Sequence, residues 1–160
     1  MGTKHHQIVV LGMGNELLKD EGIGVHIARA LRETPFPSNV VVVDGGTLPD
    51  APLSFEGVDK LIVVDAVRAG EEPGAVYHFR PEDIEPDSKA LTSLHQISLL
   101  ENLWLMERFS QKPREVIIIG VEPEDMSLGL ELSARLQERF PQIVEIVLEE
   151  IGITHTRKGG

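Results

Sequence analysis

Short apolar runs alternate along the chain with longer segments of helical periodicity. The runs are stretches of Val, Ile and Leu without polar positions between them, and they cover residues 8–11, 40–43, 61–64 and 116–119. Uninterrupted apolar strands are typical of parallel sheets, which are covered on both faces. Residues 75–79, which follow a Pro-Gly turn, predict a further strand at a sheet edge. The pattern therefore predicts a mostly parallel, twisted sheet of about five strands.

Three segments predict helices beside this sheet. Residues 22–32 and 96–109 both place apolar side chains at helical spacing. Residues 128–151 form the third helical segment, in which Pro141 either breaks the helix or begins a second one. The alternation of strands and helices predicts an α/β fold, arranged as a three-layer sandwich with helices flanking the sheet.

Size and charge narrow the class of protein. The 160 residues fit a single domain over 1–160, in which 154–160 read as a disordered tail. Fifteen Lys and Arg against 26 Asp and Glu give a net charge of −11. This charge disfavours nucleic acid and anionic membranes as partners, and it disfavours self-association, so we expect a monomer.

The chain contains no cysteine, which excludes disulfides, thiolate metal sites and cysteine nucleophiles. No apolar stretch is long enough for a signal-peptide core or a membrane span, which predicts a cytoplasmic protein.

Polar residues follow the predicted strands where an open α/β sheet binds ligands, beyond the carboxyl ends of its strands. Residues 12–24 follow the first strand, Asp44 the second, Asp65 the third and residues 122–125 the last. His95, at the start of its predicted helix, can reach the same edge. One imidazole and two or more carboxylates suit a borderline divalent metal, or activation of water by a carboxylate.

These residues also have purely structural interpretations. Asp20 and Glu21 can cap the following helix, Asp44 can be a turn residue, and His95 can be a helix cap. Asp65 is harder to explain in this way. An ionised side chain that directly ends a buried Val-Val run needs a partner.

The string from Leu11 to Gly24 resembles the opening signature of the hydrogenase maturation endopeptidases. Later blocks of that family are matched in order and at similar spacing by residues 44–47, 65–66, 93–96 and 120–123. The resemblance spans residues 7–152. It implies a twisted sheet flanked by helices and one narrow activity. That activity is removal of a C-terminal extension from the large-subunit precursor of a nickel–iron hydrogenase, once nickel is inserted.

The resemblance also assigns roles to residues of this chain. Glu21, Asp65 and His95 match the metal-contacting positions, and Asp44 matches a further acidic position linked to activity. The expected metal is a divalent transition metal, the nickel carried by the substrate. Asp44 and Asp65 are the expected catalytic residues: either one of them is the general base for water, or the metal polarises the scissile carbonyl or the water. Glu16 departs from the family, which usually has an apolar residue there. The residues expected to bind substrate are Gly45, Gly46 and Thr47.

Two rival interpretations remain open from the sequence. The glycine-rich first turn suggests a nucleotide-binding or small-molecule-binding α/β domain, although Leu17 occupies the third glycine position of a dinucleotide fingerprint. A non-catalytic metal-dependent assembly factor for the same precursor would need the same carboxylates as a protease. In the leading interpretation the partner is the precursor's C-terminal tail, docked in a groove beside the metal.

Overall fold

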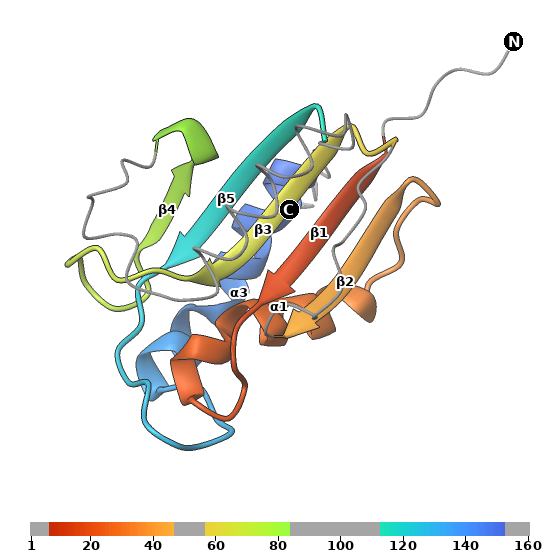
Figure 1. Cartoon of the computed structure of the whole chain (residues 1–160). Helices are drawn as coiled ribbons and strands as arrows, with labels where there is room; N and C mark the ends of the chain where they lie inside the picture. The colour runs from red at the N-terminus through yellow and green to blue at the C-terminus, as the bar shows by residue number, and fades with distance from the viewer. Residues whose placement is uncertain (1–6, 47–56, 84–112, 153–160) are drawn as a thin grey trace, which may run out of the picture.

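The central sheet has five strands in the order β2-β1-β3-β5-β4 (Figure 1). The structure is a computed structural model that describes residues 7–46, 57–83 and 113–152. The strands are β1 (Ile8–Met13), β2 (Val40–Gly46), β3 (Lys60–Ala66), β4 (Val76–Phe79) and β5 (Glu115–Val121). Neighbouring strands are parallel except β4, which pairs antiparallel with β5 at one edge. The predicted mostly parallel sheet, with residues 75–79 at an edge, is confirmed.

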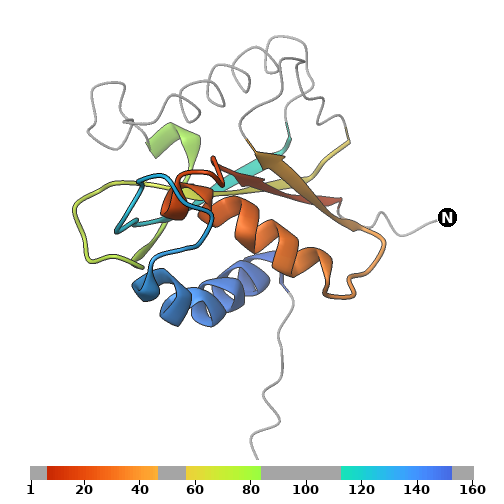
Figure 2. The ribbon, with the colours of Figure 1, turned by 90° about the horizontal axis from the view of Figure 1, so that it is seen from below.

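Two helices lie side by side on one face of the sheet, as Figure 2 shows: α1 (Ile23–Arg32) and α3 (Ala134–Ile151). A 3₁₀ turn, η1 (Lys19–Gly22), leads directly into α1, and a second, η2 (Pro81–Asp83), follows β4. The α/β fold predicted from the sequence is therefore confirmed. The predicted helix over 96–109 and the predicted disordered tail lie outside the described residues.

The last helix is shorter than predicted, and it is continuous. It begins at Ala134 rather than at residue 128, and Pro141 lies within it without ending it. Ser133 caps it, because its hydroxyl accepts a hydrogen bond from the backbone N–H of Leu136 (3.4 Å). Residues 128–132 are not helical, because the backbone of Gly129 forms hydrogen bonds with another segment of the chain. Its N–H donates to the carbonyl of Leu17, and its carbonyl accepts from the N–H of Lys19. Tertiary hydrogen bonds thus override the helical periodicity in this segment.

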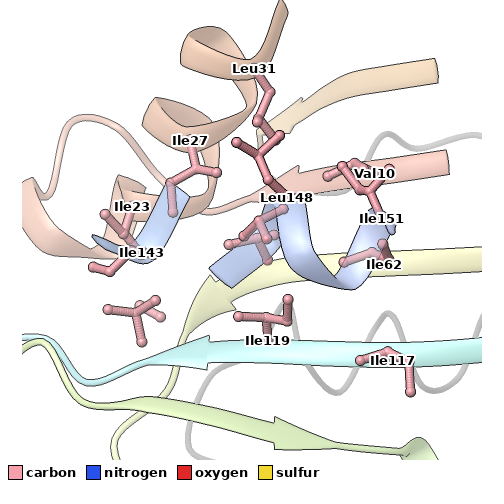
Figure 3. Packing of buried hydrophobic residues seen from close by; sticks show 14 of the residues in the cluster. Val10, Ile23, Ile27, Leu31, Ile62, Ile117, Ile119, Ile143, Leu148 and Ile151 are labelled. Atoms are coloured by element: carbon pink, nitrogen blue, oxygen red, sulfur yellow. The ribbon is translucent and has the colours of Figure 1, made fainter. Parts of the chain in front are cut away.

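Apolar side chains pack on both faces of the sheet. Between the sheet and the two helices lies a cluster whose labelled members in Figure 3 include Val10, Ile27, Ile62, Ile119 and Leu148. The opposite face buries a second cluster, which contains Leu11, Met13, Val58, Leu61, Val63, Val116 and Ile118. Burial on both faces explains why the strand sequences are continuous apolar runs rather than alternating patterns.

Helix α1 approaches the sheet so closely that only glycine fits at the contact. A Cβ atom on Gly24 would lie 2.1 Å from the carbonyl oxygen of Val64, and one on Gly12 would lie 2.1 Å from the carbonyl oxygen of Gly24. This contact places the first turn of α1, and η1 before it, against the carboxyl edge of β1 and β3.

Candidate functional site

Asp44 and Asp65 lie within two strands that are separated by β1, two residues before the end of β2 and one residue before the end of β3. Gly12 of β1 pairs with Asp44 on one side and with Val64 on the other, so Asp65 lies one residue beyond that level. Two strand spacings put the backbones of β2 and β3 roughly 10 Å apart. By the alternation of side chains, Asp44 shares the sheet face that α1 covers, whereas Asp65 shares the opposite face with Val63. The two predicted catalytic carboxylates therefore do not form a close pair.

Asp65 is almost entirely buried, with 1% of its surface exposed. Its Oδ1 accepts a hydrogen bond from the backbone N–H of Ala66 (2.8 Å). Turn η1, which carries the half-buried Glu21, packs against β3, the strand that contains Asp65. Two of the three predicted metal-contacting residues therefore belong to neighbouring elements at one edge.

The remaining residue of the predicted metal set cannot be placed in the same way. His95 lies outside the described residues, as does Thr47 of the predicted substrate-binding set. Within residues 7–46, 57–83 and 113–152, no group of three or more His, Asp or Glu side chains is arranged to hold a metal ion. The donor set of Glu21, Asp65 and His95 stays a prediction.

Gly45 and Gly46 form the end of β2 at the same edge. The backbone N–H of Gly14 donates to the carbonyl of Gly46 (2.9 Å), which ties the end of β2 to the turn after β1. Gly46 has a φ of +50°, a conformation that favours glycine. The role of these glycines in substrate binding stays a prediction.

An arginine links Asp44 to Glu16. Arg29 of α1 donates through its Nη1 to Glu16 Oε2 (2.6 Å) and through its Nε to Asp44 Oδ2 (3.3 Å). The hydrogen bond from Arg29 lowers the pKa of Glu16, and the same bond raises the pKa of Arg29. Glu16 is thus the partner of a residue that also holds Asp44. Sequence reasoning missed Arg29 because its partners lie 13 and 15 residues away, with no local signal.

Asp20 does not cap the following helix, contrary to the structural interpretation of the sequence. Helix α1 begins after Gly22 without a side-chain cap. Asp20 is fully buried and instead holds the loop before α3. Its Oδ2 accepts from the backbone N–H groups of Glu124 and Asp125 (both 2.9 Å), and its Oδ1 accepts from that of Ser133 (2.7 Å).

Glu122, the first residue after β5, organises the loop that follows β3. Its Oε1 accepts hydrogen bonds from the hydroxyl of Tyr77 (2.8 Å) and from three consecutive backbone N–H groups, those of residues 69–71 (2.7–2.9 Å). Burial alone would raise the pKa of Glu122, but these hydrogen bonds outweigh it and lower the pKa below its usual value. Burial and the contact with Glu122 raise the pKa of Tyr77 to about 12. The loop beside Asp65 is thereby fixed by a carboxylate whose individual role the sequence did not reveal.

The arrangement can support hydrolytic chemistry at one edge of the sheet. Carboxylates on separate strands can activate water or bind a metal ion, and the glycines leave room for a substrate backbone to approach. No helix of the described residues is long and apolar enough to cross a membrane.

Comparison with known proteins gives the family. Residues 25–150 match the sequence profile described as hydrogenase maturation protease. The chain is 31% identical to the hydrogenase expression/formation protein HupD of Bradyrhizobium diazoefficiens, over 98% of this chain and 85% of HupD. It is 32% identical to the hydrogenase 2 maturation protease of Escherichia coli, over 89% of this chain and 88% of that protein.

Solved structures agree with these relatives. The hydrogenase maturating endopeptidase HybD of Escherichia coli superposes with a TM-score of 0.78 at 29% identity, covering 91% of this chain and 92% of HybD. A solution structure of an Escherichia coli endopeptidase gives the same TM-score at 31% identity, covering 92% of this chain and 94% of that one. The chain belongs to the hydrogenase maturation protease family and is a peptidase.

Proposed function

We propose that this peptidase removes the C-terminal extension from the large-subunit precursor of a nickel–iron hydrogenase after nickel insertion. The relatives named as hydrogenase maturation proteases and endopeptidases support this activity. The observation that carries it is the buried carboxylate of Asp65, the penultimate residue of β3, at the ligand-binding edge of the sheet. A carboxylate at this edge of the sheet can bind a cation that the substrate delivers.

The proposed metal contacts are Glu21, Asp65 and His95, and the metal is the nickel that the precursor carries. Two carboxylates and one imidazole suit a borderline divalent ion. Three protein ligands leave coordination positions open for groups of the precursor. This incomplete set favours recognition of a metal already held by the substrate over tight binding of a resident ion.

Hydrolysis then requires a water molecule to add to the scissile carbonyl, with loss of one proton from the water and gain of one proton by the leaving amine. Either Asp44 or Asp65 accepts the proton from water, or nickel polarises the carbonyl or the water. Carboxylates that share a proton lie about 3 Å apart. The separation of the β2 and β3 ends therefore favours independent roles for Asp44 and Asp65 over a shared-proton pair.

The test is incubation of the protein with nickel-loaded large-subunit precursor, followed by mass analysis. We expect loss of a C-terminal peptide from the loaded precursor and no loss from nickel-free precursor. Binding of the loaded precursor without any cleavage would favour the assembly-factor alternative. Thermal stabilisation by nucleotides, together with an uncut precursor, would favour the nucleotide-binding alternative.

A further inference from the structure

Three of the four large apolar side chains that are exposed among the described residues gather on two loops. Leu17 is 55% exposed, Leu128 82% and Leu130 63%. The fourth, Val41, lies on the edge strand β2 and is 47% exposed. Scattered exposed apolar residues are normal, whereas a contiguous group of them marks an interaction site. We call Leu17, Leu128 and Leu130 the leucine tip.

Backbone hydrogen bonds join the two loops of the leucine tip. The N–H of Gly129 donates to the carbonyl of Leu17 (2.8 Å), and the N–H of Lys19 donates to the carbonyl of Gly129 (2.9 Å). Figure 1 shows both loops at the end of the sheet to which β1 and β5 point. The leucines are therefore presented by a braced surface rather than by independent loops.

This surface adjoins the candidate site. Leu17 lies in the same loop as Glu16, which shares Arg29 with Asp44, and four residues before Glu21. The three hydrogen bonds from the second loop to buried Asp20 fix that loop against η1. A protein bound at the leucine tip therefore contacts the molecule beside the residues proposed to act on it.

The charges around the leucine tip indicate the chemistry of the partner. Residues 122–132 contain no Lys or Arg and four acidic residues, of which Glu122 is buried and the other three lie at the surface. Glu131 follows Leu130 directly and is exposed, as is Glu124. Lys19 of η1 pairs with Asp125 (3.1 Å) and Arg135 of α3 pairs with Glu124 (3.7 Å), so Glu131, next to Leu130, supplies the main acidic charge beside the leucines. A matching surface is apolar with basic flanks, and a second copy of this chain, with the same acidic residues and a net charge of −11, is repelled.

We infer that the leucine tip docks the large-subunit precursor, through an apolar segment of the precursor flanked by basic side chains. This inference rests on the proposed function and adds to it a binding surface outside the proposed metal contacts. Docking there raises the effective concentration of the scissile segment at the site. Because it acts on binding rather than on the reacting atoms, it governs KM and leaves kcat nearly unchanged.

The test compares wild type with the double variant Leu128→Ser/Leu130→Ser. Steady-state kinetics on nickel-loaded precursor should show KM raised about tenfold or more and kcat changed by less than about twofold. The matched control is Val41→Thr, which alters an exposed apolar residue outside the leucine tip and should leave both constants unchanged. Since both leucines are more than half exposed, the double variant should melt as wild type does. An unchanged KM in the double variant overturns the inference.

Two further measurements separate the alternatives. Direct binding of wild type and the double variant to immobilised nickel-free precursor, which should not be cut, gives Kd without cleavage. A wild type that binds but does not cut nickel-loaded precursor counts against the proposed activity and not against the docking surface. In the same assay Glu131→Lys should weaken binding. Tighter binding by this variant would overturn the inference that basic side chains flank the apolar segment of the precursor. Sedimentation in which wild type dimerises and the double variant does not identifies a second copy as the occupant and overturns the inference.

Discussion

Asp65 combines near-complete burial with a position at the ligand-binding edge, so its charge is open to a direct test. Asp65→Asn keeps the shape of the side chain and removes the charge. We expect the variant to fold, to associate weakly with precursor and to process it about 10²–10⁴-fold more slowly, the usual effect of losing a general base. The measurements are a cleavage time course and a thermal melt of the same sample. A wild-type cleavage rate would show that Asp65 is not part of the site.

Glu16→Gln is the matched control for that variant, because it removes a carboxylate in the neighbouring loop. The side chain of Glu16 is 42% exposed and pairs with Arg29, which is itself half exposed. Exposed ion pairs contribute little to stability. We expect Glu16→Gln to keep most of the activity and its melting temperature, while Asp44 retains its contact with Arg29. His95→Ala, by the family resemblance, should behave like Asp65→Asn.

Glu122 gives a prediction about acid stability. Because folding lowers its pKa, the ionised form stabilises the folded protein above the usual glutamate pKa, and this contribution is lost as the pH falls through the lowered value. We expect the melting temperature of wild type to fall more steeply below about pH 4.5 than that of Glu122→Gln. At pH 7 the variant should be less stable by about 1–3 kcal/mol, because four donors lose a charged acceptor.

Tyr77→Phe removes one of those four donors and leaves the three backbone N–H groups in place. Its acid-induced loss of stability should therefore lie between that of wild type and that of Glu122→Gln. Parallel melting curves for all three proteins from pH 7 to pH 3 would contradict the role assigned to Glu122.

The strands were predictable from the sequence, because burial on both faces demands continuous apolar runs and nothing else in the chain resembles them. The residues that organise the loops were not. Arg29, Asp20 and Glu122 act on partners that are 13 to 113 residues away, so no local spacing reveals them. The start of α3 differs from the prediction for the same reason. Its preceding residues look helical, but their backbone groups bond to the chain around η1 and to Asp20.

Because α1 lies so close to the sheet, adding one methyl group at Gly24 should strongly lower the free energy of unfolding. In Gly24→Ala the new Cβ meets the backbone oxygens of Val64 and Met13 at 2.1 and 2.3 Å, and a backbone within a sheet cannot move aside cheaply. We expect a loss of at least about 3 kcal/mol in the free energy of unfolding, or failure to fold. Chemical denaturation measures it.

The control for Gly24→Ala is Gly152→Ala, at the C-cap of α3. Gly152 has a φ of +88°, and a methyl group there would meet no atoms within 4 Å, so only the backbone conformation opposes the substitution. Its expected cost is about 1–2 kcal/mol. Equal costs for the two variants would mean that crowding between α1 and the sheet is not what excludes a side chain at Gly24.

Asp20 joins two elements that are far apart in sequence, η1 and the loop before α3. Asp20→Asn replaces one oxygen by an N–H₂ group, which cannot accept from the backbone donors it faces. We expect the variant to lose about 1.5–3 kcal/mol of stability. Hydrogen exchange should quicken at the amides of Glu124, Asp125 or Ser133 before it quickens in the strands. Uniform acceleration throughout the sheet would indicate that Asp20 supports the whole fold rather than this junction.

The excess of acidic residues bears on the molecule as a whole. A charge of −11 on a 17.6 kDa chain opposes close approach of two copies, most strongly at low salt, where screening is weak. We therefore expect sedimentation velocity at micromolar concentration and low ionic strength to give a single species with the mass of one chain. The leucine tip supplies the apolar area that self-association would use, so this measurement also asks whether its acidic surroundings keep copies apart. Raising the salt concentration should weaken that repulsion, so any dimer should be detected at high salt before it is detected at low salt. A stable dimer at low salt would contradict the prediction, because contacts would then outweigh the charge without screening.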